Sequence, residues 1–519
     1  MANKNKVKMK SLRQISIAIS IAACMLCVSP AHAQLGNVLN KAKQSSQQST
    51  TTPSSGQSTA TSAAPAAQTG KALPPGEAGK IEKLSPTGQG KTIYVSVSTG
   101  AGSRTADGSQ AQAYKDMQAA IDAAPEGSVL RVAEGNYLGK MEQGFIEVKK
   151  YIVIEGGWNT AFTERNPQKY PTTIRPTEET AAAGTSGSHA LMDVIVRGNK
   201  SGLIVIDGII FDMGQYNLYC LAPSTDERAS APEGCETGRI LSPDEKPSVP
   251  KTNGIAGSRQ CLYGQADGNL IVRNCVFANA MHYGIQMQNF FGHWQVYNNL
   301  FVACRMAGCE IRGNTGNPDV EKTLDFHHNT VIFTWTRTKE LEDMGYGFRY
   351  MTGMNYDVRD NLFGCNYYGA LDHARFDSDA NREKLRVSNA FNNLFFANRM
   401  GDICLPSGGG LWNFQYAKNF EEVDRLNKYE GNREVNLQEI ELLKKVINTP
   451  YLNGYLGLTM SKSSSYSENS AMNTFRAAAG MNKQGSETIR VSMYGNRYPY
   501  DDISKLWGVI QGKGAQIVK

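Results

Sequence analysis

Charged and amide side chains follow a series of glycines in the second half of the chain. Each glycine opens a short run in which apolar and polar residues alternate, which is typical of a strand with one buried face. On that alternation Glu310 and Arg312 face outward in one run, Arg349 in another and Asp372 in a third. Carboxylates and guanidinium groups on one face are suited to general acid–base catalysis and to binding charged substrates.

Three interpretations of these charges remain open if the runs stack as neighbouring strands. Asp372 would lie two strands, or roughly 10 Å, from Glu310, which is close to the acid–base spacing of an inverting glycoside hydrolase. A lyase would instead use Arg349 or Arg312 as a base, or to neutralise a uronate carboxylate. The third interpretation is a set of cross-strand salt bridges without a catalytic role. The predicted catalytic residues are Glu310, Arg349 and Asp372.

Other polar and aromatic residues of these runs are candidates for holding a sugar. The predicted substrate-binding residues are Gln286, Arg312, Tyr350, His373 and Arg375. A one-residue shift of the strand decides which of Asp372, His373 and Arg375 face outward. Further tyrosines surround the charges, namely Tyr283, Tyr346, Tyr367 and Tyr368.

The sequence predicts neither a metal site nor a cofactor. His327 and His328 lie close to Asp325, but His328 occupies a turn position at which the other repeats have Asn or Asp. A structural role is therefore favoured for this pair. The sequence has no zinc-ligand spacing, EF-hand loop, phosphate-binding glycine loop or nucleophile elbow. A lyase-type Ca²⁺ site stays an alternative that no motif supports.

The glycines belong to a repeat that predicts how these runs are positioned. Asn-Cys-Val-Phe at 274–277 recurs in related form at 298–301, 328–331, 360–363 and 392–395, so the steps are 24, 30, 32 and 32 residues. Asn at the first position tolerates the left-handed backbone of a tight turn, and stacked Asn side chains can bond to one another. A repeat of this length is typical of a solenoid. We therefore expect an all-β fold, a parallel β-helix with three sheets.

Sequence segments near the start of the repeat region carry a family resemblance. The segments "IYVSVSTG" and "YKDMQAAIDAAPEGSVLRVAEGNY", followed by "IEGGWNTAFTERNPQKYPTTI", resemble those of the pectin-lyase-like superfamily, including bacterial cell-envelope proteins. The resemblance covers roughly residues 90–405 and implies the right-handed parallel β-helix. It implies little about activity, because that superfamily includes lyases, hydrolases, isomerases, adhesins and scaffolds.

The chain divides into four predicted regions. Residues 1–33 have a basic start, an apolar run and a small-residue cleavage motif, which predicts a signal peptide; a looser lipobox at Cys24 would instead make the protein a lipoprotein. Residues 34–87 are rich in Ser, Thr, Gln and Pro and predict a disordered tether. Residues 88–405 form the β-helix, opened by a capping helix from Met117 to Ala124, and 406–519 form a mixed C-terminal cap or strap.

The net charge limits the kinds of binding partner, and the cysteine content bears on disulfide bonds. The formal net charge is +6, and removing the five positive charges of the signal region leaves +6 − 5 = +1, so nucleic acid is not an expected partner. No segment after the signal is long and apolar enough to predict a transmembrane helix.

Eight of the 10 cysteines follow the signal and predict disulfides in an exported protein, with Cys220–Cys235 as the local pair. Buried free thiols are the alternative, most of all for Cys275 and Cys304.

Two functions are compatible with these features. The first is an exported, outer-membrane-associated, surface or periplasmic protein that binds, and in one version cleaves, a polysaccharide in a groove on one sheet face. The second is a non-catalytic envelope scaffold, adhesin or antigen with an envelope protein as its partner. The groove charges favour the first, and the tether favours the second.

Overall fold

The computed structural model describes sixteen stretches of the chain. They are residues 90–140, 144–176, 190–214, 240–241, 260–280, 282–316, 321–334, 345–373, 387–406, 414–417, 426–449, 451–452, 469, 471–483, 490–491 and 498–518. The predicted signal peptide, the predicted tether, Arg375 and the predicted Cys220–Cys235 pair lie outside them. Among the described helices, none is long and apolar enough to cross a membrane.

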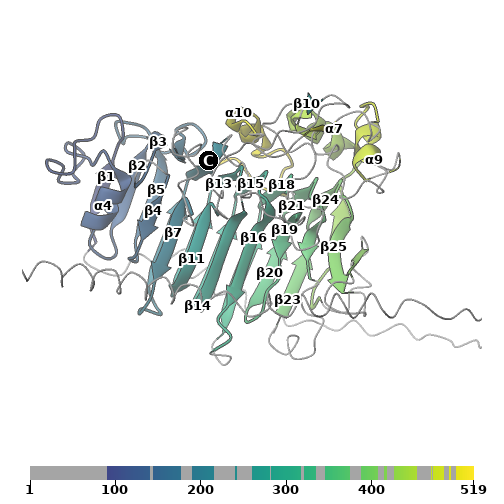
Figure 1. Cartoon of the computed structure of the whole chain (residues 1–519), viewed down its shortest axis with the longest axis horizontal. Coiled ribbons are helices and arrows are strands. Elements are labelled where there is room, and N and C mark those ends of the chain that lie inside the picture. The colour runs from purple at the N-terminus through teal and green to yellow at the C-terminus, as the bar shows by residue number, and fades with distance from the viewer. Residues whose placement is uncertain are drawn as a thin grey trace, which may run out of the picture. The chain divides into compact units, whose positions relative to one another are not determined.

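Strands of three parallel sheets, here called A, B and C, follow one another in a fixed order along the chain (Figure 1). Sheet A consists of β1 (Thr92–Val95), β2 (Val129–Ala133), β5 (Val153–Trp158), β8 (Leu203–Asp207), β12 (Asn269–Arg273), the second part of β14 (Tyr283–Tyr297), β17 (Lys322–His327), β20 (Asn355–Arg359) and β23 (Val387–Phe391). Sheet B consists of β3 (Gly135–Tyr137), β6 (Thr172–Ile174), β9 (Ile209–Asp212), β13 (Val276–Ala278), β15 (Leu300–Val302), β18 (Thr330–Ile332), β21 (Leu362–Gly364), β24 (Leu394–Phe396) and β27 (Arg433–Glu434).

Sheet C carries the candidate groove. It consists of β4 (Ile146–Val148), β7 (Met192–Val196), β11 (Leu262–Asp267), the first part of β14, β16 (Met306–Gly313), β19 (Gly345–Arg349), β22 (Gly369–Asp372), β25 (Gly401–Pro406) and the antiparallel β26 (Phe414–Ala417). Apart from a separate antiparallel pair, β10 (Ile240–Leu241) with β28 (Arg490–Val491), these strands confirm the predicted parallel β-helix, with one strand of each sheet per coil.

The repeated asparagine position makes the turn from sheet A to sheet B. Its backbone is left-handed in every described copy, with φ values of 53° at Asn274, 54° at Asn298, 51° at His328, 56° at Asp360 and 55° at Asn392. Asn and Asp tolerate this conformation better than most residues, because their short polar side chains bond locally. The structural role predicted for His328 therefore agrees with its backbone.

The next residue of each repeat forms a buried ladder of amide hydrogen bonds. The Asn299 backbone N–H donates to Asn329 Oδ1 at 3.0 Å, and the Asn329 N–H donates to Asn361 Oδ1 at 2.9 Å. The Asn361 N–H continues the ladder to Asn393 Oδ1 at 3.1 Å. Each side-chain Nδ2 also donates to a carbonyl of the preceding coil, as Asn361 does to Phe326 at 3.0 Å. The ladder thus satisfies the backbone donors of a buried turn.

Apolar residues that follow the ladder stack inside the coils. The rings of Phe211, Phe277 and Phe301 lie parallel with centroids 5.1 and 4.7 Å apart. At the repeated glycine the next coil leaves no room for a side chain: a Cβ on Gly308 would lie 2.7 Å from the Gly347 carbonyl oxygen and 2.8 Å from Val331. The inward face of each sheet is therefore set by packing between successive coils.

The predicted helix near the N-terminal end is α4 (Met117–Ala123), with Asp116 as its N-cap. Its residues Met117, Ala120 and Ile121 are buried in the core. The Gln118 side chain bonds both the N–H and the carbonyl of Glu147 on β4. In the described part of the structure, α4 therefore satisfies backbone groups of β4 that no earlier strand of sheet C pairs with.

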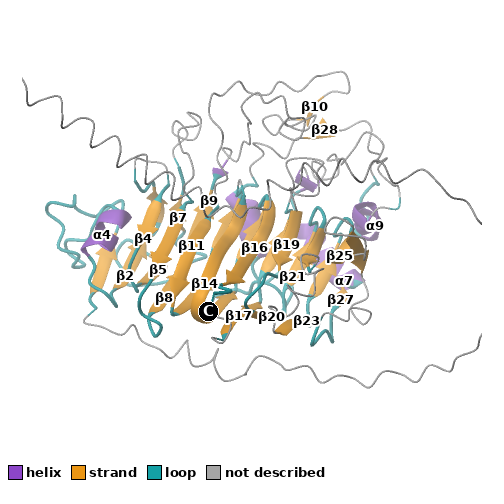
Figure 2. Ribbon diagram, turned by 60° about the horizontal axis from the view of Figure 1, so that its bottom comes forward, coloured by secondary structure: helices purple, strands orange, loops and turns teal. Residues whose placement is uncertain are grey.

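The C-terminal region lies against the outer face of sheet B. It contains α7 (Leu437–Val446), which has the expected Asn436–Glu439 capping box, with α9 (Ala471–Ala478), α10 (Tyr500–Ile503) and the 3₁₀ turn η4 (Ser504–Leu506). One apolar cluster joins outward residues of β15, β18 and β21 to residues of these helices. Figures 1 and 2 show the helices beside the β13–β24 strands, so this face is covered.

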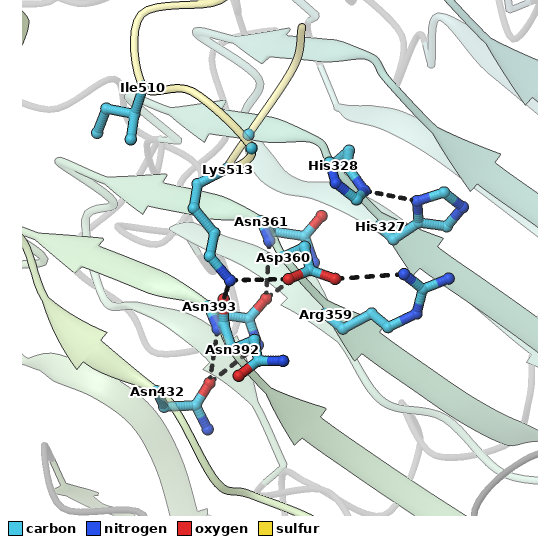
Figure 3. A network of polar contacts seen from close by, with 12 residues as sticks. His327, His328, Arg359, Asp360, Asn361, Asn392, Asn393, Asn432, Ile510 and Lys513 are labelled. Carbon is cyan, nitrogen blue, oxygen red and sulfur yellow. Dashed lines mark hydrogen bonds and ion pairs between the residues drawn. The ribbon is translucent and has the colours of Figure 1, made fainter.

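The last residues of the chain bond to the turns of five coils. Lys513 Nζ lies 2.7 Å from Asp360 Oδ1 and 2.6 Å from the Asn392 carbonyl oxygen (Figure 3). The Gln516 N–H donates to Asn298 Oδ1 at 2.6 Å, and the Val518 N–H donates to Gln168 Oε1 at 3.3 Å. The segment 498–518, here called the strap, thus connects coils far apart in sequence.

The six cysteines that the structure describes are buried thiols outside disulfides, namely Cys261, Cys275, Cys304, Cys309, Cys365 and Cys404. The prediction of disulfides is wrong for these six, and the alternative of buried thiols holds. Burial raises the pKa of Cys275 and of Cys304 to about 12, which keeps both thiols protonated and unreactive.

Replacing Asn361 by Ala should lower the free energy of unfolding by about 3 kcal/mol, because it leaves the Asn329 N–H and other ladder groups buried without partners. Denaturant unfolding would measure the loss. Asn482→Ala is the control, since Asn482 is exposed and accepts a hydrogen bond from Arg476 through its backbone carbonyl, which the substitution keeps. Equal effects of the two substitutions would contradict a stabilising role for the ladder.

Candidate active site

One row of side chains crosses the outer face of sheet C. Register partners on successive strands place in this row, here called the groove row, Glu147, Asp193, Tyr263, Gln286, Glu310, Arg349 and Asp372. Their chain neighbours Ile285, Ile311 and Phe348 lie in the core, so the row itself points outward. The strand alternation predicted from the sequence is therefore correct for Gln286, Glu310, Arg349 and Asp372.

The three predicted catalytic residues meet in a buried ion-paired triad. Arg349 Nη1 lies 2.6 Å from Glu310 Oε2, and Arg349 Nε lies 2.9 Å from Asp372 Oδ2. Glu310 and Arg349 are each 3% exposed and Asp372 is 2% exposed. A single guanidinium thus bridges two carboxylates from the strands on either side of it.

Neighbouring polar groups extend this triad along the row. Gln286 Nε2 donates to Glu310 Oε1 at 3.1 Å, and Gln260 Nε2 donates to Gln286 Oε1 at 2.7 Å. Arg349 Nη1 also donates to the Tyr283 hydroxyl oxygen at 2.9 Å. The bonds hold the orientation of Gln286, Glu310 and Arg349, because each of these side chains is bonded on two sides.

The charges around the triad act on two nearby pKa values. Burial opposes the charge on Arg349, but Tyr283, Glu310 and Asp372 outweigh it and raise the pKa of the guanidinium. Burial and the charges of Arg305 and Arg349 hold the pKa of His282 well below its usual value. Arg349 is therefore a fixed cation, and His282 is neutral at physiological pH.

The arrangement corrects the hydrolase geometry expected from the sequence. An inverting hydrolase needs room for a water between its two carboxyl groups. Here the space between Glu310 and Asp372 is occupied by the guanidinium of Arg349, which bonds both. The neighbours of Arg349 raise its pKa and keep the guanidinium protonated, so a role as a base is also disfavoured. The salt-bridge interpretation describes these three residues best.

The predicted binding residues fall into three groups. Arg312 is exposed and lies in a second outward row, where it is the register partner of Gln288. Tyr350 and His373 each follow a groove-row residue in the chain and therefore point inward, so their predicted place in the groove is wrong. The Tyr350 ring packs on Phe348, and its hydroxyl donates to the Asn389 carbonyl at 2.9 Å. His373 is 1% exposed and lies 2.9 Å from the Ser388 hydroxyl. Arg375 lies outside the described residues.

Two outward residues of this face were missed by the sequence reasoning. Tyr263 is 41% exposed between Asp193 and Gln286 in the groove row, and Ile195 is 43% exposed beside it. Neither strand begins with the repeated glycine of the later coils. The alternation in Leu262-Tyr263-Gly264-Gln265-Ala266 carries the signal, but the long insertion before it hides the register.

The structure describes no group of three or more His, Cys, Asp or Glu residues that could hold a metal ion. His327 and His328 face each other with Nδ1 atoms 2.8 Å apart, and His327 stacks on Tyr297 with ring centroids 4.8 Å apart. Burial and Arg359 keep the pKa of His327 well below its usual value. These contacts are those of packed side chains at a turn.

Comparisons with known proteins give a likeness of fold. No protein-family model and no curated protein matches the chain. Among solved structures, the chain is similar to a GH136 lacto-N-biosidase from Eubacterium ramulus: the native structure shows 11% identity and a TM-score of 0.30, covering 66% of this chain and 68% of that one. The selenomethionine derivative shows 10% identity, a TM-score of 0.29 and coverage of 66% and 67%. At this level the likeness says nothing about activity.

Replacing Arg349 by Met should lower the free energy of unfolding at neutral pH by about 3–5 kcal/mol, because two buried carboxylates lose their counterion. Urea unfolding at neutral pH would measure the loss. Arg312→Met is the matched control on the same face and should change stability by less than about 0.5 kcal/mol. A loss that is the same in both variants would argue against the triad.

Proposed function

We propose that this protein is exported and binds a polysaccharide along the outer face of sheet C. The observation that carries the proposal is the groove row, in which each of seven successive strands contributes one outward side chain and six of these are charged or amide groups. Successive strands lie about 4.8 Å apart, so a linear polymer crossing them meets one such side chain at each step. Solenoids commonly use such extended surfaces for binding.

The open part of this face has the chemistry that sugars need. Tyr263 presents part of its ring to solvent, and an aromatic face packs on the C–H face of a sugar ring. Gln265, Gln286 and Gln288 are half-buried around it, and amide groups both donate to and accept from hydroxyl groups. The exposed Arg312 adds a cation at the end of the second row.

The triad supports binding better than cleavage. Its side chains are almost fully buried and bonded to one another, so they hold the polar surface in place and orient Gln286. Membership in the pectin-lyase-like superfamily, location in the envelope and the four regions along the chain are part of the same proposal. They rest on the sequence features described above.

A second function remains a candidate because of the same burial. A closed salt-bridge triad needs no ligand, which fits an envelope scaffold or adhesin whose sheet C is only structural. The two functions differ in one respect that can be measured. The glycan-binding protein needs Tyr263 and its amide neighbours, and the scaffold does not.

Titration of the full chain with a panel of uronate-containing and neutral polysaccharides would test the proposal by calorimetry. Tyr263→Ala should weaken binding about five- to tenfold, the effect of losing roughly 1–1.5 kcal/mol of ring packing. Tyr263→Phe keeps the ring and should retain most of the affinity. Leu442→Ala, a change at a 38% exposed residue on α7, is the control for nonspecific surface effects.

The same polysaccharides should show neither unsaturated products by ultraviolet absorbance nor new reducing ends. If the parent protein cleaves a polysaccharide and Glu310→Gln or Arg349→Ala abolishes that cleavage, the triad is catalytic and the proposal of binding alone is wrong. Affinity that is absent for every polysaccharide, or unchanged in Tyr263→Ala, would favour the scaffold.

A further inference from the structure

A second polar row lies on the outer face of sheet A, away from the groove row. Register partners on β14, β17, β20 and β23 place side by side Gln295, Asp325, Asp357 and Asn389. The residues that flank Asp325 and Asp357 in their strands, such as Phe326 and Val358, lie in the core. The four polar side chains therefore share one outward row, here called the oxygen row.

Oxygen atoms of this row are buried without partners. Among the described residues, Gln295 Oε1, Asp325 Oδ1 and Asn389 Oδ1 have no hydrogen-bond donor. Gln295 is 4% exposed, Asp325 8% and Asn389 0%, so these side chains are almost closed to bulk solvent. A buried acceptor that lacks a partner costs about 1–3 kcal/mol, and three in neighbouring positions need an explanation.

The two carboxylates of the row add an unfavourable charge interaction. Asp325 and Asp357 are register partners on adjacent strands, so two like charges are neighbours in the row. Arg359 Nη2 lies 2.8 Å from Asp325 Oδ2 and offsets part of this charge. Arg359 is shared with Asp360 and reaches Asp325 through Oδ2, so Asp325 Oδ1 is the oxygen left without a donor.

The spacing of the row matches the coordination distance of a hard cation. Ca²⁺ binds carboxylate and amide oxygens at about 2.3–2.6 Å, so two oxygens on opposite sides of one ion are roughly 5 Å apart. Equivalent atoms on neighbouring strands are about 4.8 Å apart. An ion between Asp325 and Asp357 would thus have one carboxylate from each strand.

We propose that Asp325 and Asp357, with an amide oxygen of Asn389 or Gln295, form a Ca²⁺ site on sheet A. Asn389 Nδ2 donates to Asp357 Oδ1 at 3.3 Å, and turning its amide over would direct Oδ1 toward the ion. Two carboxylates and amides suit Ca²⁺, which accepts irregular oxygen shells and keeps water ligands, better than Zn²⁺. The site links three consecutive coils and does not depend on the glycan proposal.

Positive groups near the row limit the affinity. Arg359 and Lys428 act on Asp357, and His327 lies 3.7 Å from Asp325 Oδ2 and is kept neutral by its lowered pKa. Lys513 of the strap bonds Asp360, the other partner of Arg359 (Figure 3). With so few protein ligands and these cations nearby, we expect a dissociation constant on the order of 1 mM, the range of extracellular calcium modules.

Thermal and denaturant unfolding of the full chain, first treated with chelator, tests the site. CaCl₂ at about 10 mM should raise the folding equilibrium constant about tenfold relative to MgCl₂ at equal ionic strength, as expected at ten times the dissociation constant. Direct calcium titration by calorimetry should show saturable binding. Asp357→Asn should abolish both effects. Glu164→Gln, which alters an exposed carboxylate, should leave both unchanged.

Asp325→Asn separates this proposal from its rival, in which Asp325 simply holds a proton. In the rival case, Asp325→Asn would stabilise the protein in the presence of chelator. The parent protein would also show no response to calcium. These two results together would overturn the proposal. A calcium response that survives in Asp357→Asn would also overturn it, since the ion would then lie elsewhere. If Asp357→Asn fails to fold, loss of the calorimetric signal in a folded Asp325→Asn decides in favour.

Discussion

The hydrogen bonds of the asparagine ladder are the constraint on which the other features depend. In five successive coils, from Asn274 to Asn392, the chain turns from sheet A to sheet B through a left-handed residue, and Asn299, Asn329, Asn361 and Asn393 link these coils by hydrogen bonds. The ladder keeps equivalent residues of these coils side by side. The inward and outward faces of the following strands then stay aligned, because side chains alternate strictly along a strand. The oxygen row and the part of the groove row that holds Glu310, Arg349 and Asp372 lie in these coils.

The groove row and the oxygen row differ in how their buried charges are neutralised and hydrogen-bonded. In the groove row, the carboxylates of Glu310 and Asp372 share one guanidinium, and the charge is neutralised locally. In the oxygen row, Asp325 and Asp357 are neighbours of like charge, flanked by amides with unbonded oxygens. A closed ion pair is compatible with a structural role, whereas unbonded buried oxygens are costly. The second arrangement therefore points more strongly to a missing ligand.

The sequence was sufficient for the fold because the repeat contains two signals in phase. The Asn turn and the later glycine together fixed the strands and the neighbours Glu310, Arg349 and Asp372. The sequence could not give burial: Tyr350 and His373 differ from their outward neighbours by one position, and the shift between inside and outside depends on how the glycine corner packs. It also missed Tyr263, because the coil of this residue follows a long insertion. It missed the oxygen row, because carboxylates and amides spaced about 30 residues apart form no recognised metal-binding motif.

The strap has a consequence for the order in which the molecule assembles. Its partners include Gln168 in an early coil and Asn279, Asn298, Thr330 and Asp360 in later ones, at separations of 350 residues for Val518 and 219 for Tyr498. Local coil-by-coil stacking can proceed as the chain emerges, but these contacts must wait until the strap, which follows all the coils in the chain, has been made. Until then the apolar outer face of sheet B has no cover from the strap. Docking of the strap is therefore a separate, later kinetic step, and before it the coils expose a surface prone to aggregation.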